Sequence, residues 1–219
     1  MRIKICGITT PADAIAAIDA GVDAIGFNFY PPSPRYIAPQ SLARWINQLP
    51  PFVITVAVLV NPSKQDIEAV EDMMTINLWQ LHGHESPSYC ASLKPRRIIK
   101  ALRITSSADF GLAQDFCVTS LLIDAPTPLL GGSGQTCDWS LARHFCQHSR
   151  IPVILSGGLT PDNVAQAILT VRPHAIDVCS GVESTPGKKD PIKMRDFIAS
   201  AREAAQILKT ASHPPTSFL

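Results

Sequence analysis

Strand-like and helix-like segments alternate eight times along this chain, and no other feature limits the possible fold as strongly. Short β-rich runs are bounded by turn residues. Helix-start signals lie between them, at Thr10-Pro11-Ala12-Asp13, Asn61-Pro62-Ser63, Asp138-Trp139-Ser140 and Thr160-Pro161-Asp162. The eight predicted strands are Arg2–Cys6, Asp23–Phe29, Val53–Val60, Ile76–His82, Arg97–Arg103, Thr119–Asp124, Ile151–Ser156 and Ala175–Ser180.

The spacing of these segments favours a closed barrel. Eight units in 219 residues take about 27 residues each, close to the ~30 residues of a βαβ unit. Eight such units close a (β/α)₈, or TIM, barrel, and an open doubly wound sheet is the alternative. We predict an α/β fold with one barrel over residues 1–210, followed by a disordered tail over residues 211–219.

The charge and hydropathy of the chain limit the kinds of binding partner that we expect for it. The chain has 19 Lys and Arg against 18 Asp and Glu, a formal net charge of +1, and no basic run. We therefore expect no binding to nucleic acid or to a membrane surface. The longest apolar run, Phe52–Val60, is far shorter than the ~20 residues of a membrane-spanning helix, and no signal-peptide core follows Met1. The predicted location is the cytoplasm.

The cysteines and glycine motifs argue against a metal or nucleotide cofactor. Six cysteines are scattered along the chain without a C-x-x-C pair, so neither a disulfide framework nor a zinc site is predicted. The segment Gly181–Lys189 lacks Walker A spacing. The run Gly131-Gly132-Ser133-Gly134 lacks the third glycine of a dinucleotide fingerprint. We expect neither ATP nor NAD as a cofactor.

Polar side chains gather where the predicted strands end. Active sites of barrels of this kind form at the carboxyl ends of the strands, and buried polar groups are hard to justify as packing. We therefore predict an active site at this end of the barrel. The residues concerned are Cys6, Asn28, Gln80, His82, Arg103, Asp124, Ser156 and Ser180, with Asp177 just inside the last strand.

Two glycine-containing loops predict a phosphate site. Ser156-Gly157-Gly158 follows the seventh strand and Ser180-Gly181 follows the eighth, where barrels often bind phosphate through backbone N–H groups. Glycine permits a close approach of the backbone and a positive φ. Ordinary strand-to-helix turns are the alternative. The expected ligand is a small phosphorylated molecule.

Three strand-end residues are candidates for acid–base chemistry. Lys4 and Cys6 share one face of the first strand, and a nearby cation lowers the pKa of a thiol. Asp124 ends an apolar strand, and could act as a general acid if its surroundings raise its pKa. The alternatives are an inert buried cysteine and a turn or cap aspartate. For His82, a hydrogen-bonding role is at least as well supported as catalysis.

With these residues in view, the chain closely resembles the phosphoribosylanthranilate isomerase family over nearly its whole length. Cys137 and Cys179 stand where that family usually has Phe and Ser. The motifs that carry the resemblance are Lys4-Ile5-Cys6-Gly7-Ile8-Thr9, Ser33-Pro34-Arg35-Tyr36, Gln80-Leu81-His82-Gly83, Leu122-Ile123-Asp124, Gly131-Gly132-Ser133-Gly134-Gln135-Thr136, Ser156-Gly157-Gly158-Leu159, Ser180-Gly181-Val182-Glu183-Ser184 and Pro186-Gly187-Lys188-Lys189-Asp190.

The resemblance implies a cofactor-free Amadori rearrangement of N-(5′-phosphoribosyl)anthranilate in tryptophan biosynthesis. It implies that Asp124 is the acid, that Cys6 is the base, and that Arg35 contacts the anthranilate carboxylate. Asp177 and His82 match substrate-site positions, and Gly157, Gly158, Ser180 and Gly181 match the phosphate loops. Another phosphosugar isomerase and a barrel that binds without turnover are the alternatives. A monomer and a homodimer are both compatible with the sequence.

Overall fold

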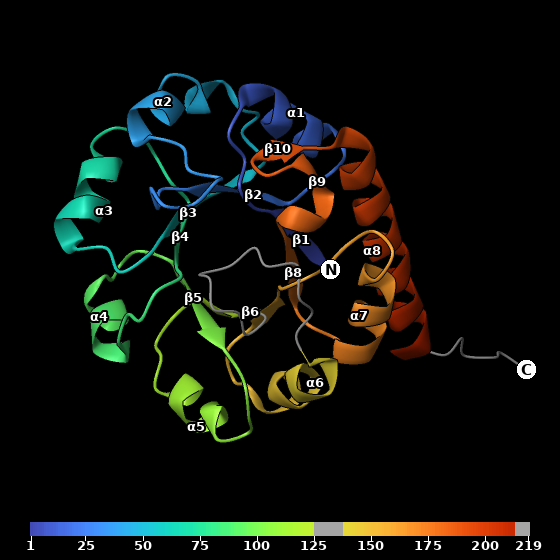
Figure 1. The fold of residues 1–219 in the computed structure, drawn as a ribbon. Coiled ribbons are helices and arrows are strands. Elements are labelled where there is room, and N and C mark those ends of the chain that lie inside the picture. Colours follow the sequence, from blue (N-terminus) through green and yellow to red (C-terminus); the bar gives the residue numbers. More distant parts are fainter. Residues whose placement is uncertain (125–137, 213–219) are drawn as a thin grey trace, which may run out of the picture.

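The computed structural model describes residues 1–124 and 138–212, and its eight main strands form a closed parallel barrel (Figure 1). Each strand pairs with the next in chain order, and the last pairs with the first. The predicted (β/α)₈ architecture is confirmed. The strands are β1 (Arg2–Ile5), β2 (Ala24–Asn28), β3 (Ile54–Leu59), β4 (Leu78–Leu81), β5 (Ile98–Arg103), β6 (Ser120–Asp124), β7 (Val153–Leu155) and β8 (Ala175–Val178).

Helices surround the barrel as an outer ring (Figure 1). The α-helices are α1 (Pro11–Asp19), α2 (Pro39–Ala43), α3 (Lys64–Glu71), α4 (Pro87–Ser92), α5 (Asp109–Gln114), α6 (Trp139–His148), α7 (Val164–Val171) and α8 (Pro191–Ser212). Two 3₁₀ turns, η1 (Ile46–Gln48) and η2 (Ser180–Val182), and a hairpin of β9 (Glu183–Thr185) and β10 (Lys188–Lys189) complete the described elements.

Side-chain caps explain where several helices begin. The Thr10 side chain accepts from the Asp13 N–H before α1, and Ser63 and Asp66 form a capping box before α3. Asp138 caps α6. The signal at Thr160-Pro161 places the start of α7 too early, because the Asn163 side chain accepts from the Thr160 N–H and donates to the Gly158 carbonyl. These bonds hold a turn, so α7 begins at Val164.

Two apolar layers leave room for polar chemistry at one end of the barrel. A large cluster packs the outer face of the strands against the helices, and includes Ile3, Ile5, Ile25 and Phe27. The barrel interior holds a smaller cluster of Ala24, Val56, Leu78, Ile99, Ala101, Leu122 and Ile154. Alternation along each strand sends successive side chains to opposite layers. In β1, the outward Ile3 and Ile5 therefore leave Lys4 facing inward.

The structure shifts most of the predicted strand boundaries and adds a hairpin. All but two of the eight strands begin one or two residues later than predicted, and all but two end one or two residues earlier. α8 extends to Ser212, two residues into the segment 211–219 that the sequence predicts as a tail. The β9–β10 hairpin was not predicted, and its turn uses Gly187 at φ +83°. Two predictions concern residues outside the described ones. They are the tail at residues 213–219, and the part of the family resemblance that lies at Gly131–Thr136 and Cys137.

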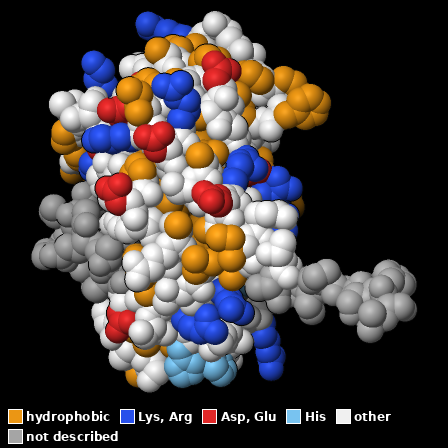
Figure 2. Space-filling view, turned by 90° about the vertical axis from the view of Figure 1, so that its right-hand side faces the viewer, with side chains coloured by type: hydrophobic (Ala, Val, Ile, Leu, Met, Phe, Trp, Pro, Cys, Tyr) orange, Lys and Arg blue, Asp and Glu red, His pale blue; other side chains and the backbone are white. Residues whose placement is uncertain are grey.

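Charges of both signs are interspersed on the face shown in Figure 2, with small apolar areas between them. In the described part of the chain, no helix has the length and apolar character needed to span a membrane.

Candidate active site

One cavity opens at the carboxyl ends of the barrel strands and collects residues from most of them. Of the predicted site residues, Arg103 and Gly181 are missing from its lining. The predicted residues that line it are Cys6, Asn28, Arg35, Gln80, His82, Asp124, Ser156, Gly157, Gly158, Asp177 and Ser180, and they are joined by Tyr30, Ser33, Val58, Val60, Leu159, Val178 and Cys179.

The base candidate lies in a buried charged cluster. Lys4 and Asp177 are register partners across β1 and β8, and the Lys4 Nζ lies 2.9 Å from the Asp177 Oδ1. A Cβ atom on Gly26 would stand 2.9 Å from the Lys4 Nζ and 3.0 Å from the Cys6 Sγ. The bare glycine of β2 therefore makes room for the ammonium group and the thiol to share one corner of the barrel.

This cluster favours a thiolate at Cys6. A hydrogen bond from the Cys179 thiol and the nearby Lys4 charge outweigh burial and hold the pKa of Cys6 well below its ordinary value. Burial raises the pKa of Asp177 to about 7, against the pull of Lys4. Burial opposes the charge of Lys4, but Asp177 and Cys6 raise the pKa of the lysine above its usual value. The Lys4 ammonium group thus interacts favourably with two acidic side chains, Cys6 and Asp177.

The acid candidate belongs to a chain of three hydrogen-bonded side chains. The Gln80 Nε2 lies 3.0 Å from the His82 Nδ1, and the His82 Nε2 lies 3.2 Å from the Asp124 Oδ2. In this orientation of the amide, Gln80 donates to Nδ1, so His82 carries its proton on Nε2 and donates to the Asp124 carboxylate. His82 is therefore a hydrogen-bonding partner of Asp124, one of the two roles that the sequence analysis left open.

Turning the Gln80 amide over would reverse this chain. The Gln80 Oε1 is buried and, among the described residues, has no hydrogen-bond partner in the present orientation. Facing His82, that oxygen would accept from a protonated Nδ1, and the bare Nε2 would accept from a protonated Asp124. The arrangement can therefore hold Asp124 either as a carboxylate or as an acid.

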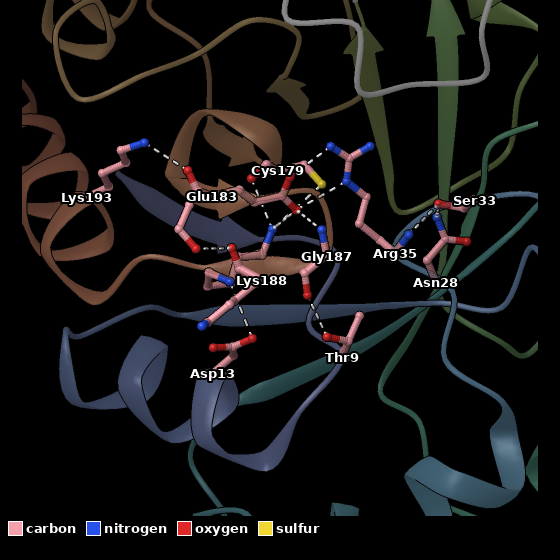
Figure 3. Close-up of polar contacts among 12 residues, drawn as sticks. Thr9, Asp13, Asn28, Ser33, Arg35, Cys179, Glu183, Gly187, Lys188 and Lys193 are labelled. Carbon is pink, nitrogen blue, oxygen red and sulfur yellow. Dashed lines mark hydrogen bonds and ion pairs between the residues drawn. The ribbon is translucent and has the colours of Figure 1, made fainter.

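Arg35 is fixed by a buried ion pair that the sequence did not predict (Figure 3). Its Nε and Nη2 lie 3.1 and 2.8 Å from the two carboxylate oxygens of Glu183. The Lys189 Nζ lies 2.9 Å from the same carboxylate. Arg35 and, after it, Lys189 outweigh burial and lower the pKa of Glu183. The planar fork of Arg35 is thus held at the cavity with its Nη1 outside the Glu183 pair.

The loop before Arg35 is shaped by side-chain hydrogen bonds as well as by its prolines. The Ser33 Oγ accepts from the Arg35 backbone N–H at 3.2 Å and from the Asn28 Nδ2 at 3.0 Å (Figure 3). Asn28 also accepts from the Tyr30 N–H. The end of β2 and the loop that follows it therefore act as one unit that places Arg35.

The two glycine loops lie against each other at the cavity. Gly157 and Gly158 have φ angles of +90° and +63°, a conformation that favours glycine. Gly181 has a different role: a Cβ atom there would stand 1.8 Å from the Leu159 carbonyl oxygen. It allows the loop after β8 to pack on the loop after β7, and it does not itself line the cavity.

Within residues 1–124 and 138–212, no group of three or more His, Cys, Asp or Glu side chains is placed to hold a metal ion.

Comparison with known proteins identifies the family. A family model described as N-(5′-phosphoribosyl)anthranilate (PRA) isomerase matches residues 3–200. The chain belongs to this family. A relative from Trichlorobacter lovleyi, named N-(5′-phosphoribosyl)anthranilate isomerase, is 46% identical over 93% of this chain and 99% of its own. The resemblance inferred from the sequence motifs is confirmed.

Solved structures of the family have the same fold. Phosphoribosyl anthranilate isomerase from Thermotoga maritima aligns with a TM-score of 0.85 and 43% identity, covering 93% of this chain and 99% of that one. A phosphoribosyl anthranilate isomerase in complex with reduced 1-(o-carboxyphenylamino)-1-deoxyribulose 5-phosphate aligns with a TM-score of 0.81 and 40% identity, at the same coverage of both chains.

Proposed function

We propose that this chain performs its family's reaction by acid–base catalysis, with Cys6 as the base and Asp124 as the acid. The reaction is the Amadori rearrangement of N-(5′-phosphoribosyl)anthranilate to 1-(2-carboxyphenylamino)-1-deoxyribulose 5-phosphate in tryptophan biosynthesis. The observation that carries the proposal is one cavity lined by a thiol favoured as thiolate and by a carboxyl group bonded to a histidine.

Ring opening is the first step. Asp124 donates a proton to the furanose ring oxygen, the bond from that oxygen to C1′ breaks, and the nitrogen lone pair forms an iminium ion. His82, hydrogen-bonded to Asp124 and to Gln80, steadies the carboxyl group and can return a proton to it. The hydrogen bonds of Gln80 and His82 are therefore compatible with Asp124 both before and after it gives up its proton.

Proton removal from C2′ is the second step. The Cys6 thiolate takes this proton, and the electron pair of the C–H bond forms a C1′–C2′ double bond while the iminium electrons return to nitrogen. The resulting enolamine becomes the ketone when C1′ takes up a proton and the C2′ hydroxyl gives up its proton. The substrate nitrogen is the electron sink, so this route calls on no cofactor. Lys4 balances the negative charge of the thiolate within the buried cluster.

The substrate is held at both ends. The Ser156-Gly157-Gly158 loop and the start of η2 at Ser180 offer backbone N–H groups for the 5′-phosphate, and Gly181 keeps these two loops in contact. Glu183 pairs with the Nε and Nη2 of Arg35, so the Arg35 Nη1 is the group offered to the anthranilate carboxylate. Asp177 completes the cavity wall beside Lys4.

Inorganic phosphate is expected to compete with the substrate, because both need the same backbone N–H groups. Gly157→Val should raise the KM and weaken phosphate inhibition by about 10- to 100-fold, since 1.5–3 kcal/mol of charge-assisted hydrogen bonding is lost. Steady-state kinetics at varied phosphate measures both effects. Gly111→Val, where a Cβ atom meets nothing within 4 Å, is the matched control. Noncompetitive inhibition would contradict the site.

Arg35→Met is expected to weaken binding of phosphoribosylanthranilate by roughly 1.5–3 kcal/mol, the range for hydrogen bonds to charged groups. The substitution also leaves Glu183 with fewer partners, so the variant is compared on two ligands. An analogue whose aromatic ring lacks the carboxylate should lose much less affinity. Equal losses for the two ligands would show that Arg35 does not contact the carboxylate.

The activity is tested with phosphoribosylanthranilate generated in situ, whose fluorescence decays as it is consumed. We expect a decay rate proportional to the concentration of the chain and well above the spontaneous rate. Decay at the spontaneous rate, with the ligand still bound, would instead indicate a barrel that binds without turnover. Conversion of a phosphosugar in place of this substrate would indicate the other alternative.

The assembly is proposed as either a monomer or a homodimer in the cytoplasm. One solved relative, 38% identical with a TM-score of 0.82, is described as monomers generated from a dimeric phosphoribosylanthranilate isomerase of Thermotoga maritima. Light scattering distinguishes the single-chain mass of 23.7 kDa from its double.

A further inference from the structure

We propose that Cys6 and Cys179 form a reversible disulfide under oxidising conditions, so that the active site contains its own redox switch. Disulfide formation goes beyond the isomerase reaction. Only its effect on activity rests on the proposed role of Cys6.

Barrel closure brings these two cysteines together. β1 and β8 pair in register through Lys4 with Asp177 and Ile5 with Val178, so Cys6 and Cys179 directly follow the paired ends of the two strands. The Cys6 N–H donates to the Val178 carbonyl at 2.8 Å, which continues the pairing one residue past β1. Adjacent strands lie about 4.7–4.9 Å apart, and disulfides usually join Cα atoms about 4.4–6.8 Å apart.

The side chains of the pair also meet. Cys6 and Cys179 each follow an inward-facing residue, Lys4 or Asp177, by two positions. Both line the cavity, and the Cys179 thiol is hydrogen-bonded to Cys6. The Cys179 Sγ lies 3.0 Å from the position that a Cβ atom on Gly7 would take. The second sulfur thus lies against the residue that follows the first.

The two thiols have complementary chemistry. The lowered pKa of Cys6 favours its thiolate form. The hydrogen bond from Cys179 to Cys6, together with burial, raises the pKa of Cys179 and keeps this second thiol protonated. The Lys189 Nζ lies 3.0 Å from the Cys179 carbonyl oxygen and 3.8 Å from the Cys179 Sγ. A thiolate that attacks an oxidant, beside a thiol that can displace the product, is the arrangement of reversible redox cysteines.

The other described cysteines lack these features. Cys90 is buried outside the cavity, and burial raises its pKa to about 11. Cys117 is exposed, and Cys146 lies on α6. Neither Cys117 nor Cys146 lines the cavity.

The oxidant is a hydroperoxide. The Cys6 thiolate attacks one oxygen of hydrogen peroxide, the O–O bond breaks, and Cys6 becomes a sulfenic acid while hydroxide takes a proton to leave as water. The Cys179 sulfur then attacks the Cys6 sulfur, the S–O bond breaks, and a second water leaves with the thiol proton. Two thiols have lost two electrons and two protons to the peroxide, and a dithiol reductant reverses the change.

The switch protects Cys6 from permanent loss. A sulfenic acid without a neighbouring thiol is oxidised further to a sulfinic acid, which thiols do not reduce. With Cys179 alongside, oxidation stops at the disulfide, and removal of the oxidant restores the thiolate.

Peptide mapping and activity together test this proposal on the full chain. After treatment with hydrogen peroxide, the wild type should yield a cross-linked peptide pair containing Cys6 and Cys179 under non-reducing conditions. Its activity should fall and return almost fully with dithiothreitol. The activity of treated Cys179→Ser is compared with that of the same variant before treatment. Less than about a tenth of its lost activity should return with dithiothreitol, because Cys6 reaches the sulfinic acid. Cys117→Ser, which removes an exposed thiol outside the cavity, should behave as the wild type.

The mapping result does not depend on any assay of function. Absence of the Cys6–Cys179 peptide in oxidised wild type would overturn the proposal, as would equal recovery of wild type and Cys179→Ser. If the cross-link forms and the untreated chain shows no isomerase activity, the disulfide stands and the proposed function fails.

Discussion

Replacing Cys6 with alanine is expected to lower kcat by about 10²- to 10⁴-fold, the usual contribution of general base catalysis. A methyl group cannot accept the C2′ proton, and two groups beside Cys6 in the described structure are poor substitutes. Lys4 is held as a cation by Asp177 and Cys6, and the Cys179 thiol is kept protonated. The fold should survive, since the removed sulfur is small and lies at the end of β1.

Cys90→Ala is the matched control for this variant. Cys90 is also a buried free cysteine, but it lies on α4 and outside the cavity. Its replacement should alter thermal stability and leave kcat close to that of the wild type. Steady-state kinetics and thermal unfolding of both variants make the comparison. A Cys6→Ala enzyme that keeps more than about a tenth of the wild-type kcat would show that another group is the base.

Replacing Asp124 with asparagine is expected to lower kcat by a comparable factor, about 10²- to 10⁴-fold. Asparagine keeps the shape and a hydrogen-bonding oxygen for His82, but it cannot give a proton to the ring oxygen. The KM should change less than kcat, because the lost step occurs in the transition state. Asp19→Asn, at an exposed position at the end of α1, serves as the control and should have wild-type kinetics.

Steady-state kinetics and thermal unfolding of both variants separate a lost acid from a disturbed fold. An Asp124→Asn enzyme that folds as the wild type and keeps more than about a tenth of the wild-type kcat would contradict the assignment of Asp124 as the acid.

Local sequence patterns were sufficient to predict the barrel and most of the residues that line its cavity. Apolar runs between turn residues located all eight strands, because a buried parallel strand needs apolar side chains and ends where turn residues begin. Alternation along β1 placed Lys4 with Cys6, and the pair lies in the cavity as predicted. Positions at strand ends identified Asp124 and His82, which prove to be hydrogen-bonded to each other.

Contacts between distant segments could not be predicted in the same way. The Arg35–Glu183 pair joins residues 148 positions apart, and its geometry depends on how the β9–β10 hairpin lies against the loop after β2. Neighbouring first and last strands follow from a closed barrel, but the register that sets Cys6 beside Cys179 depends on the stagger of the strands. Gly181 was assigned to phosphate binding, although its described role is to pass close to the Leu159 carbonyl.

Alkylation of Cys6 as a function of pH tests most directly whether it works as a thiolate base. Iodoacetamide reacts with thiolates, so the rate at each pH reports the ionised fraction. Peptide mapping assigns the modified residue, and activity is measured on the same samples. We predict that Cys6 is modified rapidly well below the ordinary thiol pKa of about 8.5, that activity falls in parallel with modification, and that substrate slows both. Modification that accelerates only near pH 8.5, or full activity after Cys6 is completely alkylated, would contradict the account.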